Sequence, residues 1–251
     1  MSFYESHLTD LPHLDDRLRT VLGLVVESGA RRILDIACGR GVLLEAIRDA
    51  LPSAECTGCD VSTVALEHTT SIGFTTAVAN VEQGLPFEDE SFDVVIFGEV
   101  IEHLVDPDAA LQHVSRVLAR GGKLIVTTPN LASWFNRLLL LVGVQPIFTE
   151  TSCHVNLGRR IPALGQWKST VGHLKIFTLD ALCEMLTANG FRVGLKTGAP
   201  FPQPTPAAGL DRLLARFPTL AACIVIVATN DRTLRVDYRH IAGYLDTVSR
   251  T

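Results

Sequence analysis

Residues 32–41, Arg-Ile-Leu-Asp-Ile-Ala-Cys-Gly-Arg-Gly, constrain the fold of this 251-residue chain more than any other stretch. An apolar run carries Asp35 near its end, a turn with Gly39 and Gly41 follows, and an apolar pattern with helical spacing begins directly afterwards. A strand, a glycine-rich turn and a helix in this order form the place where an α/β sheet binds a nucleotide-like ligand. A dinucleotide-binding turn would carry a third glycine where this chain has Leu44, and the Gly-Lys-Ser/Thr of a phosphate-binding loop does not occur. The turn therefore predicts a nucleotide-like ligand that lacks a diphosphate.

Strand-like and helix-like patterns alternate through most of the chain. Strands are predicted at residues 32–37, 55–60, 74–79, 92–97, 123–128, 191–195 and 221–228. Helices are predicted at residues 42–50, 62–67, 106–119 and 178–189. Ser62 suits an N-cap, Pro107 suits a first helical turn, and Gly190 suits the position after a helix end. This order predicts an α/β fold with a doubly wound, mostly parallel seven-stranded sheet and an insert after the fifth strand.

The segments outside this alternation define the expected domain organisation. The segments are an N-terminal helical cover at residues 1–29, a main domain at 30–229, an insert within it at 130–172, and a C-terminal tail at 230–251. The tail carries a short helical pattern that includes Val236 and Leu245, and Tyr4 in the cover is a candidate to close over the ligand.

Composition and charge exclude several classes of protein. The net charge is −5 and Lys and Arg form no run beyond isolated pairs, so we expect no nucleic-acid partner. The longest apolar run, 138–144, is far shorter than the roughly 20 residues that cross a bilayer, so no transmembrane segment is expected. The first residues show no signal peptide, and six scattered cysteines suit reduced thiols in the cytoplasm. Cys56 and Cys59 are three residues apart on a predicted strand, so we expect them on opposite faces and without a metal.

Polar side chains follow the ends of four predicted strands. Asp35 ends the first strand, and Asp60 ends the second, nineteen residues after Gly41, the usual spacing for an acid that binds ribose hydroxyls. Asn80 follows the third strand, and Glu99 follows the fourth. The carboxyl ends of parallel strands meet at one edge of a sheet, and open α/β sheets bind ligands there. We therefore expect the ligand at this edge.

Several motifs in one order resemble a known family. The pattern Asp35-x-Ala37-x-Gly39-x-Gly41 resembles the first motif of class I S-adenosylmethionine (SAM)-dependent methyltransferases. Further stretches are similar to the broad small-molecule group that includes quinone-biosynthesis O-methyltransferases, namely residues 80–95, 99–103 (Glu-Val-Ile-Glu-His), 120–130 and 173–180. The similarity covers about residues 30–130 and 173–195.

The resemblance implies SAM as the cofactor and a set of residues that bind it. Gly39 and Gly41 would let the backbone approach the cofactor, the following helix N-terminus would favour its carboxylate, and Asp35 would attract its ammonium group. The expected cofactor-binding residues are Asp35, Ala37, Gly39, Gly41, Asp60, Val61, Asn80, Val81 and Glu99. Two of them depart from the family: Ala37 stands where glycine is usual, a mild change unless φ is positive, and Asn80 stands where aspartate is common.

The methyl acceptor and the catalytic group are less constrained. His103 is the candidate general base for an acceptor hydroxyl. Alternatively, His103 caps the next helix or is buried for structural reasons. Glu102 is expected to be a solvated or helix-capping acid. Trp134, His154 and His173 are candidate acceptor-binding residues. No His, Asp or Glu cluster has metal-ligand spacing, so no metal is expected.

The insert allows two interpretations. Its aromatic residues and residues 138–144 would form an apolar lid over a small-molecule acceptor that is itself hydrophobic. Alternatively, the same stretch would pack on the sheet or form the interface of a homodimer.

The expected function is SAM-dependent transfer of a methyl group to a small molecule at a hydroxyl oxygen by direct in-line displacement. Transfer to nitrogen or carbon and a non-catalytic SAM-binding module remain alternatives. A nicotinamide-dependent oxidoreductase is disfavoured by Leu44 and by the lack of a Tyr-x-x-x-Lys pair after the fourth or fifth strand.

Overall fold

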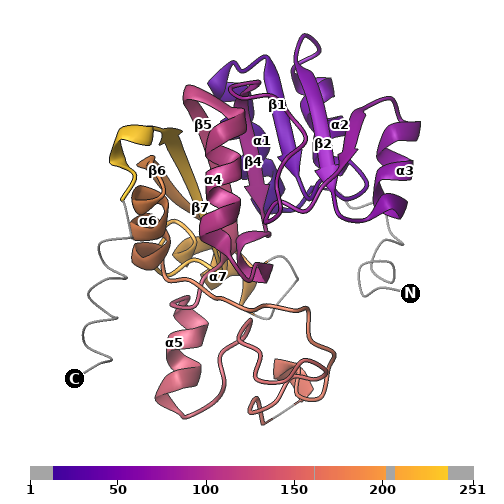
Figure 1. Ribbon diagram of the computed structural model, residues 1–251. Coiled ribbons are helices and arrows are strands. Elements are labelled where there is room, and N and C mark those ends of the chain that lie inside the picture. Colours follow the sequence, from indigo (N-terminus) through magenta and orange to yellow (C-terminus); the bar gives the residue numbers. More distant parts are fainter. Residues whose placement is uncertain (1–13, 161, 202–206, 237–251) are drawn as a thin grey trace, which may run out of the picture.

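A seven-stranded sheet forms the centre of the protein. The computed structural model describes residues 14–160, 162–201 and 207–236. The strands are β1 (Arg32–Ile36), β2 (Glu55–Asp60), β3 (Thr75–Val78), β4 (Phe92–Gly98), β5 (Leu118–Pro129), β6 (Phe191–Ala199) and β7 (Cys223–Asn230). Their order in the sheet is β3-β2-β1-β4-β5-β7-β6, and only β7 runs antiparallel to its neighbours (Figure 1). The predicted doubly wound, mostly parallel sheet is therefore confirmed.

Helices cover both faces of the sheet. They are α1 (Asp16–Ser28), α2 (Val42–Ala50), α3 (Thr63–Ser71), α4 (Pro107–Val117), α5 (Trp134–Leu141), α6 (Leu179–Ala188) and α7 (Ala208–Leu214), with short 3₁₀ turns at Ile101–His103, Pro162–Leu164 and Arg232–Leu234. Val21 of α1 and Ile47 of α2 pack on one face of the sheet. Leu111 of α4 and Leu182 of α6 pack on the other. Burial of these apolar side chains on both faces explains why the central strands are almost continuously hydrophobic.

Local signals fix several element boundaries. The side chain of Ser62 accepts a hydrogen bond from the Ala65 amide, which confirms Ser62 as the N-cap of α3. Asp106 caps α4 in the same way, with Pro107 in the first turn. Cys59 lies in the core on the α4 side, whereas Cys56 packs on the α2 side, so the two thiols face opposite ways as expected.

Several boundaries differ from the prediction; the helix predicted at 62–67, for example, continues to Ser71. At two other boundaries, pairing in the sheet overrides the local pattern. The helix predicted to reach Ala119 ends at Val117, since Leu118 already pairs with Phe92 of β4. The sixth strand continues to Ala199 past an irregularity between Val193 and Lys196, where an extra residue bulges out of the ladder with β7. Most of the expected tail helix lies outside the described residues, and so does Tyr4.

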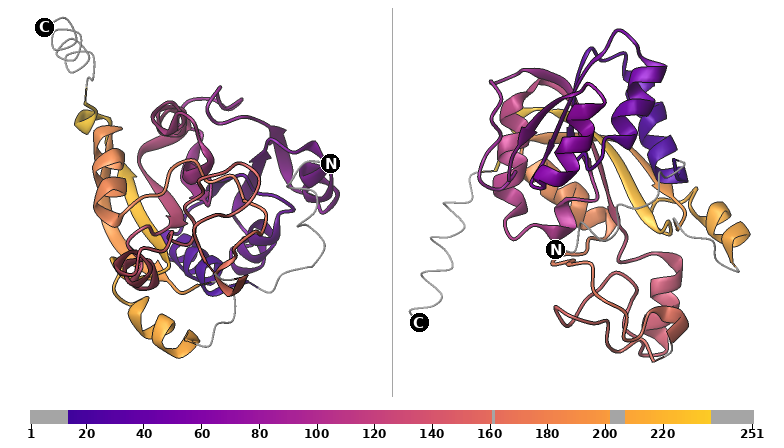
Figure 2. Two further views of the ribbon diagram at one scale, coloured as in Figure 1. Left: turned by 90° about the horizontal axis from the view of Figure 1, so that it is seen from below. Right: turned by 90° about the vertical axis from the view of Figure 1, so that its right-hand side faces the viewer.

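The segment 130–172 forms a lobe beyond the sheet. It contains α5, the turn at Pro162–Leu164 and long loops that include a bridge between Val155 and Ser169. In Figure 1 this lobe lies below the end of the sheet at which β5 finishes, and Figure 2 shows the same separation from the side. Across the described segments, no helix combines the length and apolarity needed to cross a membrane.

Candidate functional site

The turn between β1 and α2 is held by a carboxylate from the next strand. One oxygen of Asp60 accepts a hydrogen bond from the Gly39 amide (3.0 Å), and the other accepts one from the Ser62 amide (2.8 Å). Asp60 is nearly buried, and the Cys38 amide also donates to the Cys59 carbonyl (3.1 Å). These bonds position the turn, and each carboxylate oxygen keeps a further lone pair for a ligand.

Three residues of this turn have positive φ. The values are 58° for Ala37, 53° for Gly39 and 80° for Gly41. Ala37 therefore meets the exception that was stated for it, and the replacement of glycine is not mild, because a Cβ in this left-handed conformation costs about 1–2 kcal/mol.

The two glycines serve different purposes. A Cβ added to Gly39 would meet nothing within 4 Å, so the space beside the turn is open to a ligand. A Cβ added to Gly41 would lie 3.0 Å from a side-chain atom of Thr69. The Thr69 hydroxyl donates to the Gly39 carbonyl (2.9 Å). Gly41 is therefore required by packing against α3 as well as by its backbone conformation.

Arg17 of α1, which was not among the predicted site residues, reaches the same edge of the sheet. Its guanidinium donates to the Thr127 hydroxyl (3.2 Å) and lies 4.0 Å from the Glu99 carboxylate. Burial raises the pKa of the Asp35 carboxyl to about 7, Arg17 opposes this shift, and the Asp60 carboxylate adds to it. No spacing pattern links a helix at residue 17 to strands a hundred residues later, so only the folded chain reveals this contact.

Glu99 is the centre of a polar network at the ends of three strands. It follows β4 with a φ of 56°, accepts from the Thr127 hydroxyl of β5 (3.0 Å), and lies 3.4 Å from the Cys223 sulfur of β7. A non-glycine residue in this conformation marks a position that its surroundings enforce. Its carboxylate is one-third exposed, so it can still meet a ligand.

The loop after β3 holds the other predicted cofactor residues. The side-chain oxygen of Asn80 accepts from the Glu82 amide (2.9 Å), which closes an Asx turn. Val81 is buried in the core, whereas Val61 is 57% exposed. Val61 is therefore free to contact a ligand ring, and Val81 supports the loop from below.

His103 forms a pair with the histidine that directly follows the insert. The two rings of His103 and His173 have centroids 4.9 Å apart. Nδ1 of His103 lies 3.1 Å from the Gly172 carbonyl, and Nδ1 of His173 lies 2.9 Å from the Phe148 carbonyl. Burial lowers the pKa of His103 below its usual 6.5, and the His173 ring lowers it further, against the raising effect of the Gly172 carbonyl. The imidazole is therefore neutral at neutral pH, and since Asp106 caps α4, the helix-capping role for His103 is wrong.

Glu102 departs from its expected role as a solvated acid. It is fully buried, one carboxyl oxygen accepts from the Thr128 hydroxyl (2.9 Å), and the other has no hydrogen-bond partner. Burial and the nearby Glu99 carboxylate raise the pKa of Glu102 well above its usual value. An unpaired buried oxygen is costly and indicates a proton or an ion as its partner.

Three groups at this position could hold a cation. Ligand atoms of Glu102, His103 and His173 lie within 4.8 Å of one another. The Nδ1 contacts described above favour tautomers that leave the Nε2 atoms of both histidines available to a metal. The spacing along the sequence does not reveal this group, because the fold brings His173 next to residues that are seventy positions earlier.

Aromatic side chains connect the histidine pair to the insert. His173 lies next to Phe148 (6.2 Å between ring centroids), and Phe148 next to both Phe135 (6.1 Å) and Phe201 (5.7 Å). The row of rings continues to Trp134, whose ring centroid lies 5.7 Å from that of Phe135. The structure thus links two of the predicted acceptor residues, Trp134 and His173, to His103. His154 is exposed, and its described contacts do not include this group.

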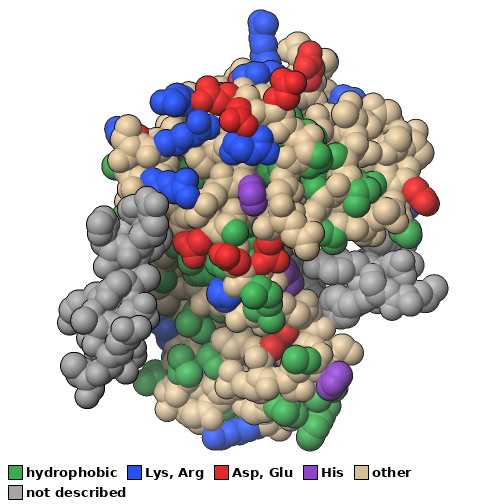
Figure 3. All heavy atoms as spheres, in the orientation of Figure 1, with side chains coloured by type: hydrophobic (Ala, Val, Ile, Leu, Met, Phe, Trp, Pro, Cys, Tyr) green, Lys and Arg blue, Asp and Glu red, His purple; other side chains and the backbone are tan. Residues whose placement is uncertain are grey.

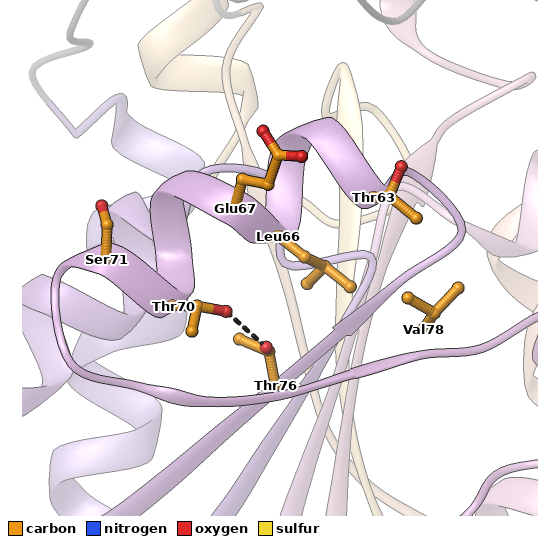
Figure 4. A pocket seen from close by; sticks show the side chains of 7 residues that line it. All are labelled: Thr63, Leu66, Glu67, Thr70, Ser71, Thr76 and Val78. Atoms are coloured by element: carbon orange, nitrogen blue, oxygen red, sulfur yellow. Dashed lines mark hydrogen bonds between the residues drawn. The ribbon is translucent and has the colours of Figure 1, made fainter.

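A separate groove lies between α3 and the edge strand β3. It has a volume of about 500 Å³ and is lined by Thr63, Leu66, Glu67, Thr70, Ser71, Thr76 and Val78 (Figure 4). The Thr70 and Thr76 hydroxyls close its floor with a 2.6 Å hydrogen bond. None of the predicted site residues lines this groove.

Comparison with known proteins decides the family. The model of a methyltransferase domain matches residues 9–194. The chain belongs to this methyltransferase domain family. A SAM-dependent methyltransferase from Archaeoglobus fulgidus superposes with a TM-score of 0.59 at 18% identity, over 91% of this chain and 100% of that one. The resemblance and the fold predicted from the sequence are both confirmed, and solved structures with this fold include SAM-dependent methyltransferases.

Curated relatives act in quinone biosynthesis. A ubiquinone biosynthesis O-methyltransferase of Brucella anthropi is 38% identical over 129 residues, which are 47% of this chain and 47% of that protein. A ubiquinone/menaquinone biosynthesis C-methyltransferase of Desulfotalea psychrophila is 32% identical over 117 residues, 44% of this chain and 47% of that protein. The chain thus spans about half the length of these relatives, and they differ in the atom that they methylate.

Proposed function

We propose that this methyltransferase-family chain transfers the methyl group of SAM to a hydroxyl oxygen of a hydrophobic aromatic small molecule. The observation that carries the proposal is the continuous row of rings from Trp134 to the His103–His173 pair, next to the edge that carries Asp35, Asp60 and Glu99. Aromatic walls favour a planar apolar acceptor, and an imidazole at their end suits removal of a hydroxyl proton.

The cofactor half of the site supplies binding groups for each part of SAM. Asp60 would accept hydrogen bonds from the ribose hydroxyls, and the open space at Gly39 would admit the cofactor to the backbone. Asp35 and Glu99 would face the ammonium group, while Val61 and Asn80 would meet the adenine. SAM supplies a methyl group that is already activated by its sulfonium.

The acceptor half would position the nucleophile and take its proton. SAM would supply the methyl group, the hydroxyl oxygen of the acceptor would receive it, and Nε2 of His103 would take the hydroxyl proton. A neutral His103, held through Nδ1 by the Gly172 carbonyl, would be ready for this role. The aromatic residues would exclude water, which favours in-line attack by the bound hydroxyl.

Binding and turnover test the proposal separately. Calorimetric titration with SAM, S-adenosylhomocysteine and NAD should give binding of the first two only. Phenols and catechols, with aliphatic alcohols and amines as controls, should then accept a labelled methyl group. Silence with both methyl-cycle ligands would contradict the proposal, and methylation of amines alone would move it to nitrogen.

The unpartnered oxygen of Glu102 supports a second means of hydroxyl activation. A divalent cation bound by Glu102, His103 and His173 would lower the pKa of the acceptor hydroxyl directly. Chelation distinguishes the two: an unchanged rate with EDTA supports His103 as base, and a loss restored by Mn²⁺ or Zn²⁺ supports the cation. Glu102→Gln should abolish the restoration without loss of SAM binding.

A further inference from the structure

Helix α5 has an inverted distribution of side chains. Its only buried residue is Asn136, whose amide group donates to the Asn130 carbonyl (3.2 Å) and the Ile147 carbonyl (3.1 Å) and accepts from the Ile147 amide (2.8 Å). By contrast, Leu138, Leu141 and Val142 are 54%, 81% and 62% exposed. A helix on the surface of a water-soluble domain packs its leucines inward. We infer that the apolar side of α5 has a partner outside the described chain.

Helix α7 enlarges the exposed apolar surface. Leu210, Leu213 and Phe217, on and just after α7, are each about half exposed. A hydrogen bond from Trp134 Nε1 to Asp211 (2.8 Å) fastens the start of α5 to α7, and Figure 2 places both helices on the same side of the molecule. We call this surface the α5–α7 face, defined by Leu138, Leu141, Val142, Leu210, Leu213 and Phe217. Apolar side chains gathered in this way are typical of an interaction site.

The charge around this face identifies the kind of partner. Residues 130–172 and 207–222 contain six Lys and Arg but two Asp and Glu, a net charge of +4 in a chain of net charge −5. Both acids are engaged internally, since Glu150 accepts from the amides of residues 171–173 and Asp211 from Trp134 and Phe201. In Figure 3 the lower lobe shows hydrophobic patches, and most Asp and Glu side chains lie above it. A two-fold dimer through this face would place like charges together, whereas an anionic bilayer would be complementary.

We propose that the α5–α7 face docks on the anionic surface of a lipid bilayer. The exposed leucines of α5 would enter the headgroup–acyl boundary, and Arg137, Arg160 and Lys168, which are exposed, would meet lipid phosphates. Phe135 lies on the same helix and begins the row of rings that ends at His103. A hydrophobic acceptor dissolved in the membrane would thus pass from the lipid along α5 to the base. The delivery of an acceptor from the membrane rests on the proposed function, whereas the binding of this face to a bilayer does not.

Vesicle binding tests the face directly. We expect the full chain to co-sediment with phosphatidylcholine–phosphatidylglycerol vesicles, to bind pure phosphatidylcholine vesicles less, and to be released by added salt. Leu138→Glu/Leu141→Glu should weaken vesicle binding by about tenfold or more, because each leucine would otherwise leave water. The matched control is Val64→Glu/Leu195→Glu, which adds the same charge at side chains that are 48% and 50% exposed on α3 and β6. This control should bind vesicles like the wild type.

Two further measurements keep the outcomes distinct. SAM affinity, measured by calorimetry, should be equal in both double variants and the wild type, which shows that each is folded. The absence of vesicle binding, or equal binding by the face variant, would overturn the inference. A wild-type dimer that the face variant dissociates would assign the face to a second copy instead. Vesicle binding without any SAM binding would leave the docking in place and refute the proposed function.

Discussion

The two halves of the site differ in how the chain builds them. The cofactor half lies on one sheet edge, and its turn, Asp60 and Ser62 are joined by hydrogen bonds over short sequence distances. The acceptor half joins β4 to an insert seventy residues later through the His103–His173 pair. The first half rests on the sheet, whereas the second depends on the lobe between β5 and α6, which the proposed function assigns to the acceptor.

The largest expected effect lies where the two halves meet. We expect His103→Ala to lower kcat by about 100- to 10,000-fold, since a positioned general base contributes that much. SAM affinity should not change, and the wild-type rate should fall on the acid side below pH 6.5, because burial holds the pKa of His103 below that value. His113→Ala, on α4, is the control. If kcat falls less than about tenfold, His103 is not the base.

A second test removes the carboxylate that organises the cofactor half. Asp60→Ala should weaken SAM binding by about 100-fold, because two charge-assisted hydrogen bonds to the ribose would be lost. Asp89→Ala, which removes an exposed ion pair with Arg116, should leave the affinity unchanged. Calorimetry measures both. Retention of wild-type affinity by the Asp60 variant would place the ribose elsewhere.

The pH dependence of SAM binding tests Asp35. Its pKa of about 7 means that the carboxyl is mostly protonated below that pH and ionised above it. If the ionised form attracts the ammonium group, affinity should rise about tenfold from about pH 6 to about pH 8. Asp35→Asn should remove this rise. A flat wild-type profile would show that Asp35 only supports the turn.

The smallest expected effect concerns backbone strain in the cofactor half. Ala37→Gly should raise the free energy of unfolding by about 0.5–1 kcal/mol, because relief of a positive φ exceeds the added chain entropy. Ala54→Gly, where φ is not positive, should lower it. Chemical denaturation compares the two. A lower stability of the Ala37 variant would show that the turn tolerates a Cβ without strain.

Elements with strong local signals were predicted to the residue. Residues 42–50 form α2 and residues 55–60 form β2 at the expected bounds, and Ser62 caps α3. The ends at Val117 and Ala199 were misplaced because pairing with a neighbouring strand outweighs the local pattern, and the end of α3, at Ser71, was placed four residues too early. The insert gave no such signal, because its loops are held by scattered side-chain contacts instead of a periodic apolar face.

The sequence by itself determined the alternation of strands and helices, the glycine turn and the acid that follows the second strand, because hydrophobic period and turn chemistry are local properties. Only the tertiary structure decided the positive φ of Ala37, the approach of Arg17 to Glu99, and the burial of Glu102 beside two histidines. It also decided that α5 turns its leucines outward. Each of these features depends on contacts between segments that are far apart in the sequence, and residue spacing does not show which of these segments meet.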